Sequence, residues 1–219
     1  MKKVAVILSG CGVYDGAEIN ESVLTLLALD KANAEVTCAA PNIKQHHVMN
    51  HFSGEECPNE SRNVLFESAR IARGNIKNLA EIKPESFDAV ILPGGFGAAK
   101  NLSSFATQGA SMTVDETVTE FLTKAQTLGK PLGFACIAPA IAAKLFGDKK
   151  IVFTIGNDPE TAEPLGSFGG CHKDTPVEDV VIDKNLKIVT TPAYMLAERI
   201  SQAERGISKL VDAVLALTY

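Results

Sequence analysis

The sequence lacks the features that proteins use to hold nucleic acids. It contains no tryptophan, so its composition gives no sign of a surface that stacks on bases or sugars. Its lysines and arginines are scattered rather than grouped, and the formal net charge is −5. A phosphate backbone is held by a cluster of basic side chains. We therefore expect no nucleic-acid partner.

Long apolar runs are also missing. The first segment, MKKVAVILSG, has two lysines and then only the five apolar residues Val4 to Leu8, which is too short for the apolar core of a signal peptide. No other run approaches the roughly 18 apolar residues that a membrane span needs. The sequence therefore predicts no membrane partner and a cytoplasmic location.

The cysteines do not form a recognisable framework. An odd number at unrelated spacings suits neither a set of disulfides nor a zinc site, and in a reducing compartment each has to be considered separately. The five are Cys11, Cys38, Cys57, Cys136 and Cys171. The three neighbouring histidines of residues 46 to 51 also show no metal-ligand spacing with a cysteine or a carboxylate. We expect no metal.

What the chain does contain is typical of one globular domain. Hydrophobic residues make up 46% and charged residues 21% of its 219 residues, and no repeat or proline-rich linker interrupts it. We therefore expect residues 1–219 to form a single domain.

Short apolar segments alternate with helical ones. The predicted strands are short apolar runs, as expected for strands buried on both faces of a parallel sheet, and Ser, Pro or Cys follows each of them at once. They are Val4–Leu8, Val36–Ala40, Phe87–Leu92 and Leu132–Ala135. The first and last helical segments carry apolar residues with a period of 3.6, at Ile19, Val23, Leu26 and Leu27 and at Ile200, Ile207, Leu210, Val211, Val214 and Leu215. The alternation predicts an α/β fold, a doubly wound and mostly parallel sheet sandwiched by helices.

Three further segments complete the prediction. The polar residues 42–80 and the Ser-, Ala- and Gly-rich Ala99–Met112 break the rhythm, and we interpret both as insertions after a strand. Near the other end, Val180–Ile182 and Leu186–Val189 predict a late β-hairpin, although its turn lacks the glycine that a tight loop prefers.

The most informative segment is GKPLGFACIAPA, residues 129–140. It takes a buried strand directly into a cysteine and then into an Ala-rich helix, which places Cys136 on a sharp turn at a helix N-terminus. Unpaired N–H groups and the helix dipole there favour thiolate, as a nucleophile requires. The alternative is that Cys136 is simply a small core residue.

Two other turns lie at the ends of predicted strands. The segment LPGGFGAAK, residues 92–100, lets the Gly95 amide point at a developing oxyanion, although many α/β loops need glycine for geometry alone. The loop SGCGVYDGAE brings Glu18 into the first turn of the first helix, where its carboxyl can hydrogen-bond the thiol as acid or base, or merely complement the helix dipole. The glycines of this loop have the wrong spacing for a dinucleotide, which excludes NAD.

Four separated blocks resemble one known family in order along essentially the whole chain. They read SGCGVYDGAEI, ILPGGFGAAKNL, GKPLGFACIAPA and IVTTPAYM, and they are similar to the ElbB branch of the DJ-1/PfpI superfamily, which is amidotransferase-like with a flavodoxin-like sheet. The resemblance implies that Cys136 is the nucleophile, that Glu18 is the acid hydrogen-bonded to it, and that Gly95 and Ile137 supply the oxyanion-hole amides.

The sequence also departs from the superfamily. Many members have His directly after the nucleophile and Gly two residues after it, where this chain has Ile137 and Ala138, so a Cys-His dyad of the PfpI type is not expected. Glutamine amidotransferases carry a His-x-Glu pair where this chain reads VTTPAY, which excludes their triad. The segment GGCH, ending at His172, resembles a Gly-Gly-His stretch of DJ-1, which makes His172 a candidate site residue; a solvated loop histidine is the alternative.

The resemblance implies a cofactor-free glyoxalase in a homodimer, converting glyoxal to glycolate and methylglyoxal to lactate, or a related deglycase acting on glycated adducts. Cys136 would add to a small reactive aldehyde, and Glu18 or His172 would carry the proton between the two carbons. The alternative is a cysteine-based redox sensor or binding protein with vestigial catalysis. The ElbB name has also been linked to isoprenoid biosynthesis, which none of these residues explains.

Overall fold

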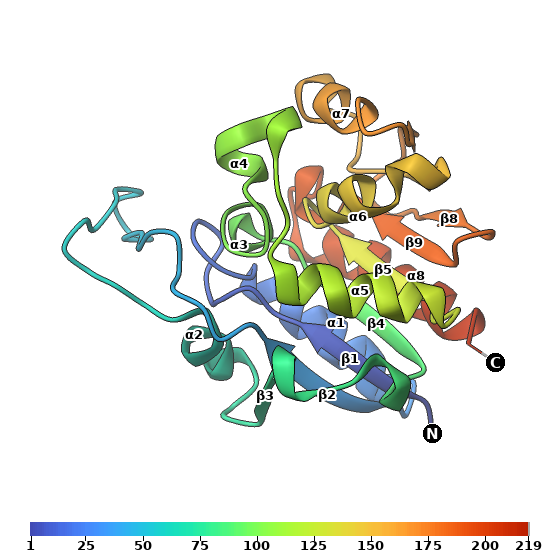
Figure 1. Ribbon diagram of the computed structural model, residues 1–219, viewed down its shortest axis with the longest axis horizontal. Coiled ribbons are helices and arrows are strands. Elements are labelled where there is room, and N and C mark those ends of the chain that lie inside the picture. Colours follow the sequence, from blue (N-terminus) through green and yellow to red (C-terminus); the bar gives the residue numbers. More distant parts are fainter. Residues whose placement is uncertain (219) are drawn as a thin grey trace.

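A seven-stranded sheet runs through the middle of the computed structural model, which describes residues 1–218 (Figure 1). The strand order is β3-β2-β1-β4-β5-β9-β8, and every neighbouring pair is parallel except β8 and β9. The strands are β1 (Lys3–Ile7), β2 (Glu35–Ala40), β3 (Ile76–Asn78), β4 (Ala89–Leu92), β5 (Leu132–Ala135), β8 (Val181–Asp183) and β9 (Ile188–Thr191). The predicted doubly wound fold is confirmed.

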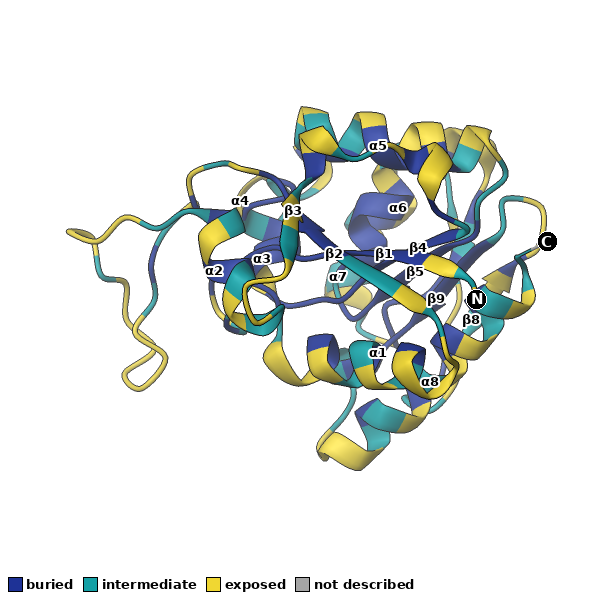
Figure 2. Cartoon of the chain, turned by 90° about the horizontal axis from the view of Figure 1, so that it is seen from below, coloured by how far each residue is buried: buried dark blue, intermediate teal, exposed yellow. Residues whose placement is uncertain are grey.

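Helices cover both faces of this sheet, and Figure 2 shows the sheet nearly edge-on between them. On one face lie α5 (Glu116–Thr127) and α6 (Pro139–Phe146), and on the other lie α1 (Ile19–Lys31) and α8 (Ile200–Ala216). Alternate residues of β1 enter two separate cores: Ala5 packs on the α5 and α6 side and Val4 on the α8 side. Because both faces are buried, the central strands read as continuous apolar runs.

The remaining elements are short. They are α2 (Val64–Ile71), α3 (Phe96–Lys100), α4 (Phe105–Gln108), α7 (Pro159–Gly166), the 3-10 turns η1 (Leu79–Glu81), η2 (Pro84–Ser86), η3 (Gly109–Ser111), η4 (Gly147–Lys149) and η5 (Ala193–Met195), and the separate strand pair β6 (Val152–Phe153) and β7 (Cys171–His172). Within residues 1–218, no helix combines the length and the apolar character needed to cross a membrane.

The interpretation of residues 42–80 as one insertion is wrong in its second half. Residues 64–71 form α2, and β3 is the edge strand of the main sheet, parallel to β2. β3 escaped prediction because it is only three residues long, IKN, and none of them is fully buried. The first half does leave the sheet as a long loop that projects from the molecule (Figure 1), with Phe52 fully exposed.

The late hairpin is confirmed, and a side chain replaces the missing glycine in its turn. The Asp183 carboxylate accepts hydrogen bonds from the N–H groups of Asn185 and Leu186, both at 3.0 Å. Lys187 then takes a left-handed conformation with φ of 55°. An aspartate that bonds the backbone two residues later is a recognised way to form a turn.

Helix α1 is oriented against its apolar pattern. The predicted apolar face is largely exposed, at 45% for Ile19, 49% for Val23 and 42% for Leu27. The side that faces the sheet instead buries Glu21, together with Ser22 and Thr25. This orientation brings an acidic side chain into the interior.

Candidate active site

Cys136 lies on a sharp turn between β5 and α6. Its backbone N–H donates to the carbonyl of Thr191 at 2.9 Å, and its φ is 59°, a left-handed value that is uncommon for any residue except glycine. Pro139 at the first position of α6 starts the helix immediately afterwards. A strained, non-glycine residue at the carboxyl end of a central strand is a feature that clusters at functional sites.

The carboxyl group beside this thiol is that of Glu21. The side chain of Glu21 is completely buried and forms a hydrogen bond with the Cys136 thiol. Its two oxygens also accept backbone N–H groups, Oε2 from Gly94 at 2.8 Å and Oε1 from Tyr194 at 3.1 Å. Burial raises the pKa of Glu21 from the usual 4.5 to about 7, although these hydrogen bonds favour the carboxylate.

The pKa of Cys136 is raised well above its ordinary value. Burial is the largest cause, followed by the charge of Glu21, while hydrogen bonds from the backbone N–H groups of Gly95 and Ile137 act in the opposite direction. The expectation that the helix N-terminus would lower this pKa is therefore wrong. The thiol is only 8% exposed, so the thiolate form loses most of its hydration. This cost exceeds the stabilisation that the first turn of α6 gives to the negative charge.

The turn after β4 brings Gly94 and Gly95 against this pair. A Cβ on Gly94 would lie 2.4 Å from the Cβ of Cys136 and 2.7 Å from Oε2 of Glu21. Gly95 has a φ of 92°, and a Cβ there would lie 2.3 Å from the backbone nitrogen of Glu18. Only glycine lets the backbone approach this closely. The predicted amides of Gly95 and Ile137 thus do meet, at the sulfur of Cys136.

Glu18 does not take the place predicted for it. It is the N-cap of α1, and its carboxylate accepts the backbone N–H of Glu21 at 2.6 Å. The acid bonded to the thiol is one helical turn further along, where the side chain points into the interior instead of across the helix end. Glu18 still lines the pocket in front of Cys136.

His172 also lies outside this arrangement. It belongs to β7, its Nε2 accepts the backbone N–H of Ile155 at 3.2 Å, and its ring meets the edge of Phe153 with 5.5 Å between centroids. It is not among the residues that line the pocket of Cys136. The prediction that it joins the site is therefore wrong, because the short β6–β7 sheet holds its ring as a structural acceptor.

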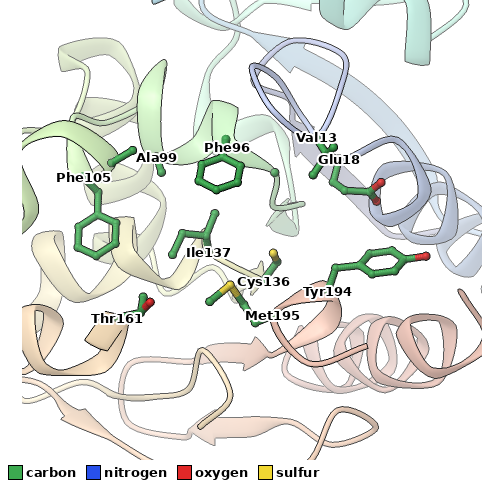
Figure 3. Close-up of a pocket in the computed structure, with 12 residues that line it drawn as sticks. Val13, Glu18, Phe96, Ala99, Phe105, Cys136, Ile137, Thr161, Tyr194 and Met195 are labelled. Carbon is green, nitrogen blue, oxygen red and sulfur yellow. The ribbon is translucent and has the colours of Figure 1, made fainter. Parts of the chain in front are cut away.

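A pocket of about 260 Å³ opens in front of Cys136 (Figure 3). It lies at the carboxyl ends of β1, β4 and β5, where a doubly wound sheet reverses its strand order and usually binds its ligands. Its lining residues are Val13, Glu18, Gly95, Phe96, Ala99, Phe105, Ala106, Cys136, Ile137, Thr161, Tyr194 and Met195. Within residues 1–218, no three His, Cys, Asp or Glu side chains come together as a metal site.

No family model matches the chain, but individual relatives do. It is 44% identical to the ES1 protein homolog of Rattus norvegicus over 99% of this chain and 84% of that one. It is also 44% identical to the glutamine amidotransferase-like class 1 domain-containing protein 3 of Homo sapiens, over 99% of this chain and 83% of that one. A solved structure from Ehrlichia chaffeensis, described as an isoprenoid biosynthesis protein with an amidotransferase-like domain, superposes with a TM-score of 0.91 at 35% identity, covering 98% and 99% of the two chains.

Sheet order and cysteine turn together define an amidotransferase-like α/β protein with a buried thiol at its strand-to-helix turn. The chain belongs to the class I glutamine amidotransferase-like family that includes the ES1 proteins, and its fold is shared by proteins of the DJ-1 superfamily. Glyoxalase III of Candida albicans is a distant structural neighbour, at 15% identity and a TM-score of 0.65 over 100% and 98% of the chains, which is a likeness of fold alone.

The predicted cytoplasmic location is contradicted by these relatives. The rat and human proteins, and the ES1 protein of Danio rerio, are all named as mitochondrial. The prediction rested on the lack of an export signal and of a membrane span, and neither observation distinguishes the cytoplasm from the mitochondrion.

Proposed function

We propose that the protein is a cofactor-free enzyme that converts small 2-oxoaldehydes into 2-hydroxy acids, such as methylglyoxal into lactate and glyoxal into glycolate. The observation that carries the proposal is the buried pair of Glu21 and Cys136. A carboxyl with a pKa of about 7 exchanges its proton readily near neutral pH, as a general acid and base must. The sulfur it contacts is the strongest nucleophile among the side chains at the site.

The first step is addition to the aldehyde. The thiol proton of Cys136 passes to Glu21 while sulfur bonds to the aldehyde carbon and the carbonyl electron pair moves to oxygen. The amides of Gly95 and Ile137, which already point at the sulfur, are placed to bind the oxyanion beside it. Glu21 then returns its proton to that oxygen and is again a carboxylate.

The second step moves hydrogen between the two carbons. Glu21 takes the proton from the carbon bonded to sulfur, which gives an enediolate, and delivers it to the neighbouring carbon. The hydroxyl proton on the first carbon moves to the oxygen of the second, which becomes the alcohol. One carbon is oxidised to a thioester as the other is reduced to an alcohol, so no external oxidant is needed. Water then breaks the carbon–sulfur bond, releases the 2-hydroxy acid and restores the thiol.

The alternative function, a redox sensor based on Cys136, is less well supported than catalysis. Peroxide reacts with thiolates that are exposed and have a low pKa, whereas Cys136 is nearly buried and its pKa is raised. A neighbouring base that removes the proton during the reaction overcomes this for a nucleophile but not for a sensor. The buried pair therefore favours catalysis.

We also propose that the protein is a homodimer that uses the exposed face of α1. Ile19, Val23 and Leu27 are exposed and four residues apart, so they form one apolar stripe that is nearly symmetric about Val23. Two copies of α1 that cross at Val23 would each cover the stripe of the other, as a two-fold interface requires.

The test of the enzymatic proposal is turnover without glutathione. The purified protein should convert methylglyoxal to lactate, and Cys136→Ala should abolish the conversion. Cys171→Ala is the matched control, because Cys171 is an exposed cysteine outside the pocket. If the wild-type protein turns over neither glyoxal nor methylglyoxal, the proposal is wrong.

A further inference from the structure

The pocket in front of Cys136 has an apolar end that glyoxal does not use. In Figure 3, Phe96, Phe105 and Ile137 lie on one side of Cys136, whereas Glu18 and Tyr194 lie on the other. Phe96 and Phe105 come from the short helices α3 and α4, and Ile137 comes from the cysteine turn itself. A substrate held at the sulfur is therefore flanked by hydrocarbon in one direction.

Apart from the two amides at the sulfur, this pocket offers no partner for an anionic group. Its lining contains no lysine, arginine or histidine, and its ionisable side chains are those of Glu18, Cys136 and Tyr194. The Glu18 carboxylate is engaged with the N–H of Glu21, and the Tyr194 hydroxyl accepts from Asn20 at 3.1 Å. A phosphate or carboxylate on the substrate would be desolvated without compensation.

The volume is also too large for the smallest substrates. At roughly 30 Å³ for each water-sized group, a pocket of about 260 Å³ holds about nine such groups. The two carbons and two oxygens of a 2-oxoaldehyde head fill four of these places. About five remain, and the apolar side chains around them favour carbon.

We propose that the preferred substrates are uncharged 2-oxoaldehydes whose ketone carbon carries an apolar substituent of about five carbons. The proposal rests on the 2-oxoaldehyde chemistry assigned above. It adds that the arm between Phe96, Phe105 and Ile137 binds the substituent and selects among aldehydes that share one reactive head.

The experiment is a series of 2-oxoaldehydes with unbranched alkyl groups from methyl to octyl. The value of kcat/KM should rise about threefold to fourfold with each added methylene, which is the usual worth of burying one, and then fall once the chain exceeds the pocket. A member of matched length that ends in a carboxylate should be a poor substrate. Equal kcat/KM along the series, with turnover retained, would overturn this inference and leave the proposed reaction standing.

A variant at the rim of the arm distinguishes a loss of space for the alkyl group from a general loss of activity. Ala106 lines the pocket and is exposed, so Ala106→Phe narrows the arm without entering the core. It should lower the ratio of kcat/KM for the pentyl over the methyl substrate by about tenfold. Ala80→Phe is the matched control, at an exposed alanine of η1 outside this pocket, and should keep the ratio.

Binding of unreactive ketones tests the apolar arm even if the protein turns over no aldehyde. The thermal midpoint Tm should rise with the chain length of 2-alkanones at equal concentration, because a tighter ligand stabilises the folded state more. Ala106→Phe should remove this trend. If the trend is present without turnover, the proposed reaction is wrong and the apolar arm stands; if the trend is absent, the arm is wrong as well.

Discussion

The carboxyl group of Glu21 and the thiol of Cys136 form a hydrogen-bonded pair in a place that water barely reaches. They come from α1 and from the turn after β5, and Gly94 lies against both. The hydrogen bond and the charge of Glu21 raise the pKa of Cys136, whereas the hydrogen bond from the thiol lowers the pKa of Glu21. The two groups therefore titrate as a coupled pair and compete for one proton. This shared proton is the physical basis of the proposed chemistry.

Gly94→Ala should disrupt the pair. The added methyl group would meet both the Cβ of Cys136 and the carboxyl of Glu21 at under 3 Å, so one of them has to move. Overpacking of this kind costs about 1–3 kcal/mol of unfolding free energy, and we expect turnover of methylglyoxal to be lost with it. Urea unfolding and a lactate assay measure the two effects. Gly166→Ala in α7 is the control, since a Cβ there meets no neighbour.

Stability should depend on pH through Glu21. Its pKa is raised from 4.5 to about 7 on folding, so the folded state holds the proton more tightly than the unfolded chain. The contribution is fully present below pH 4.5 and is lost as pH rises through 7, by roughly 3 kcal/mol at about 1.4 kcal/mol per pKa unit. Cys136 also has a raised pKa, but its contribution is lost only at more alkaline pH.

Urea unfolding at pH 5 and pH 8 measures this loss. Wild-type protein should lose roughly 3 kcal/mol more between the two values than Glu21→Gln, in which the titrating group is gone. Equal losses in the two proteins would mean that Glu21 has an ordinary pKa in the folded state.

Local sequence patterns predicted Cys136 and the amide of Gly95, and the family resemblance added the amide of Ile137, but neither predicted the carboxyl of Glu21. Cys136 follows β5 directly, and Gly95 follows β4 after Pro93 and Gly94. The ends of neighbouring parallel strands meet at one edge of a sheet, so the placement of both residues follows from short segments. Glu21 belongs to the polar face of an amphipathic pattern, which normally faces water. Here that face is inside and Val23 is outside, and a single sequence does not show which face is covered.

The case of Glu18 and His172 is similar. Both residues lie next to recognisable motifs, but backbone hydrogen bonds determine where their side chains point. Glu18 accepts the N–H of Glu21, and His172 accepts the N–H of Ile155. These contacts depend on where α1 begins and on the pairing of β6 with β7, and both are determined only in the folded chain. A hint of Glu21 was present in its position one turn after Glu18, beside the small polar Ser22 and Thr25 that let α1 approach the sheet.

His172→Asn should leave the reaction close to wild type. The imidazole accepts the N–H of Ile155 and lies outside the pocket, so its loss should cost about 1 kcal/mol of stability and less than threefold in kcat, well short of the usual worth of a general acid or base. Steady-state kinetics and thermal unfolding of the same preparation check this. A loss of about 10²-fold in kcat at full folding would return His172 to the mechanism.

Val23→Glu should convert the proposed dimer to a monomer. The substitution places a charge at the centre of the exposed α1 stripe, where it would be desolvated in a two-fold contact. Light scattering over a range of concentrations gives the mass. Leu128→Glu is the control, at a 40% exposed leucine at the end of α5. If both variants and the wild type share one mass, α1 is not the interface.

The pH dependence of kcat/KM for methylglyoxal, in wild type and in Glu21→Gln, tests the central role of the buried pair. Wild type should gain activity as pH rises through about 7, because Glu21 has to be ionised to receive the thiol proton. Glu21→Gln should lose about 10²-fold or more and lack this rise. Glu18→Gln removes the cap of α1 and a charge that raises the pKa of Glu21, so it should keep the rise but move it to lower pH. A Glu21→Gln protein that is folded and shows the wild-type profile would contradict the account.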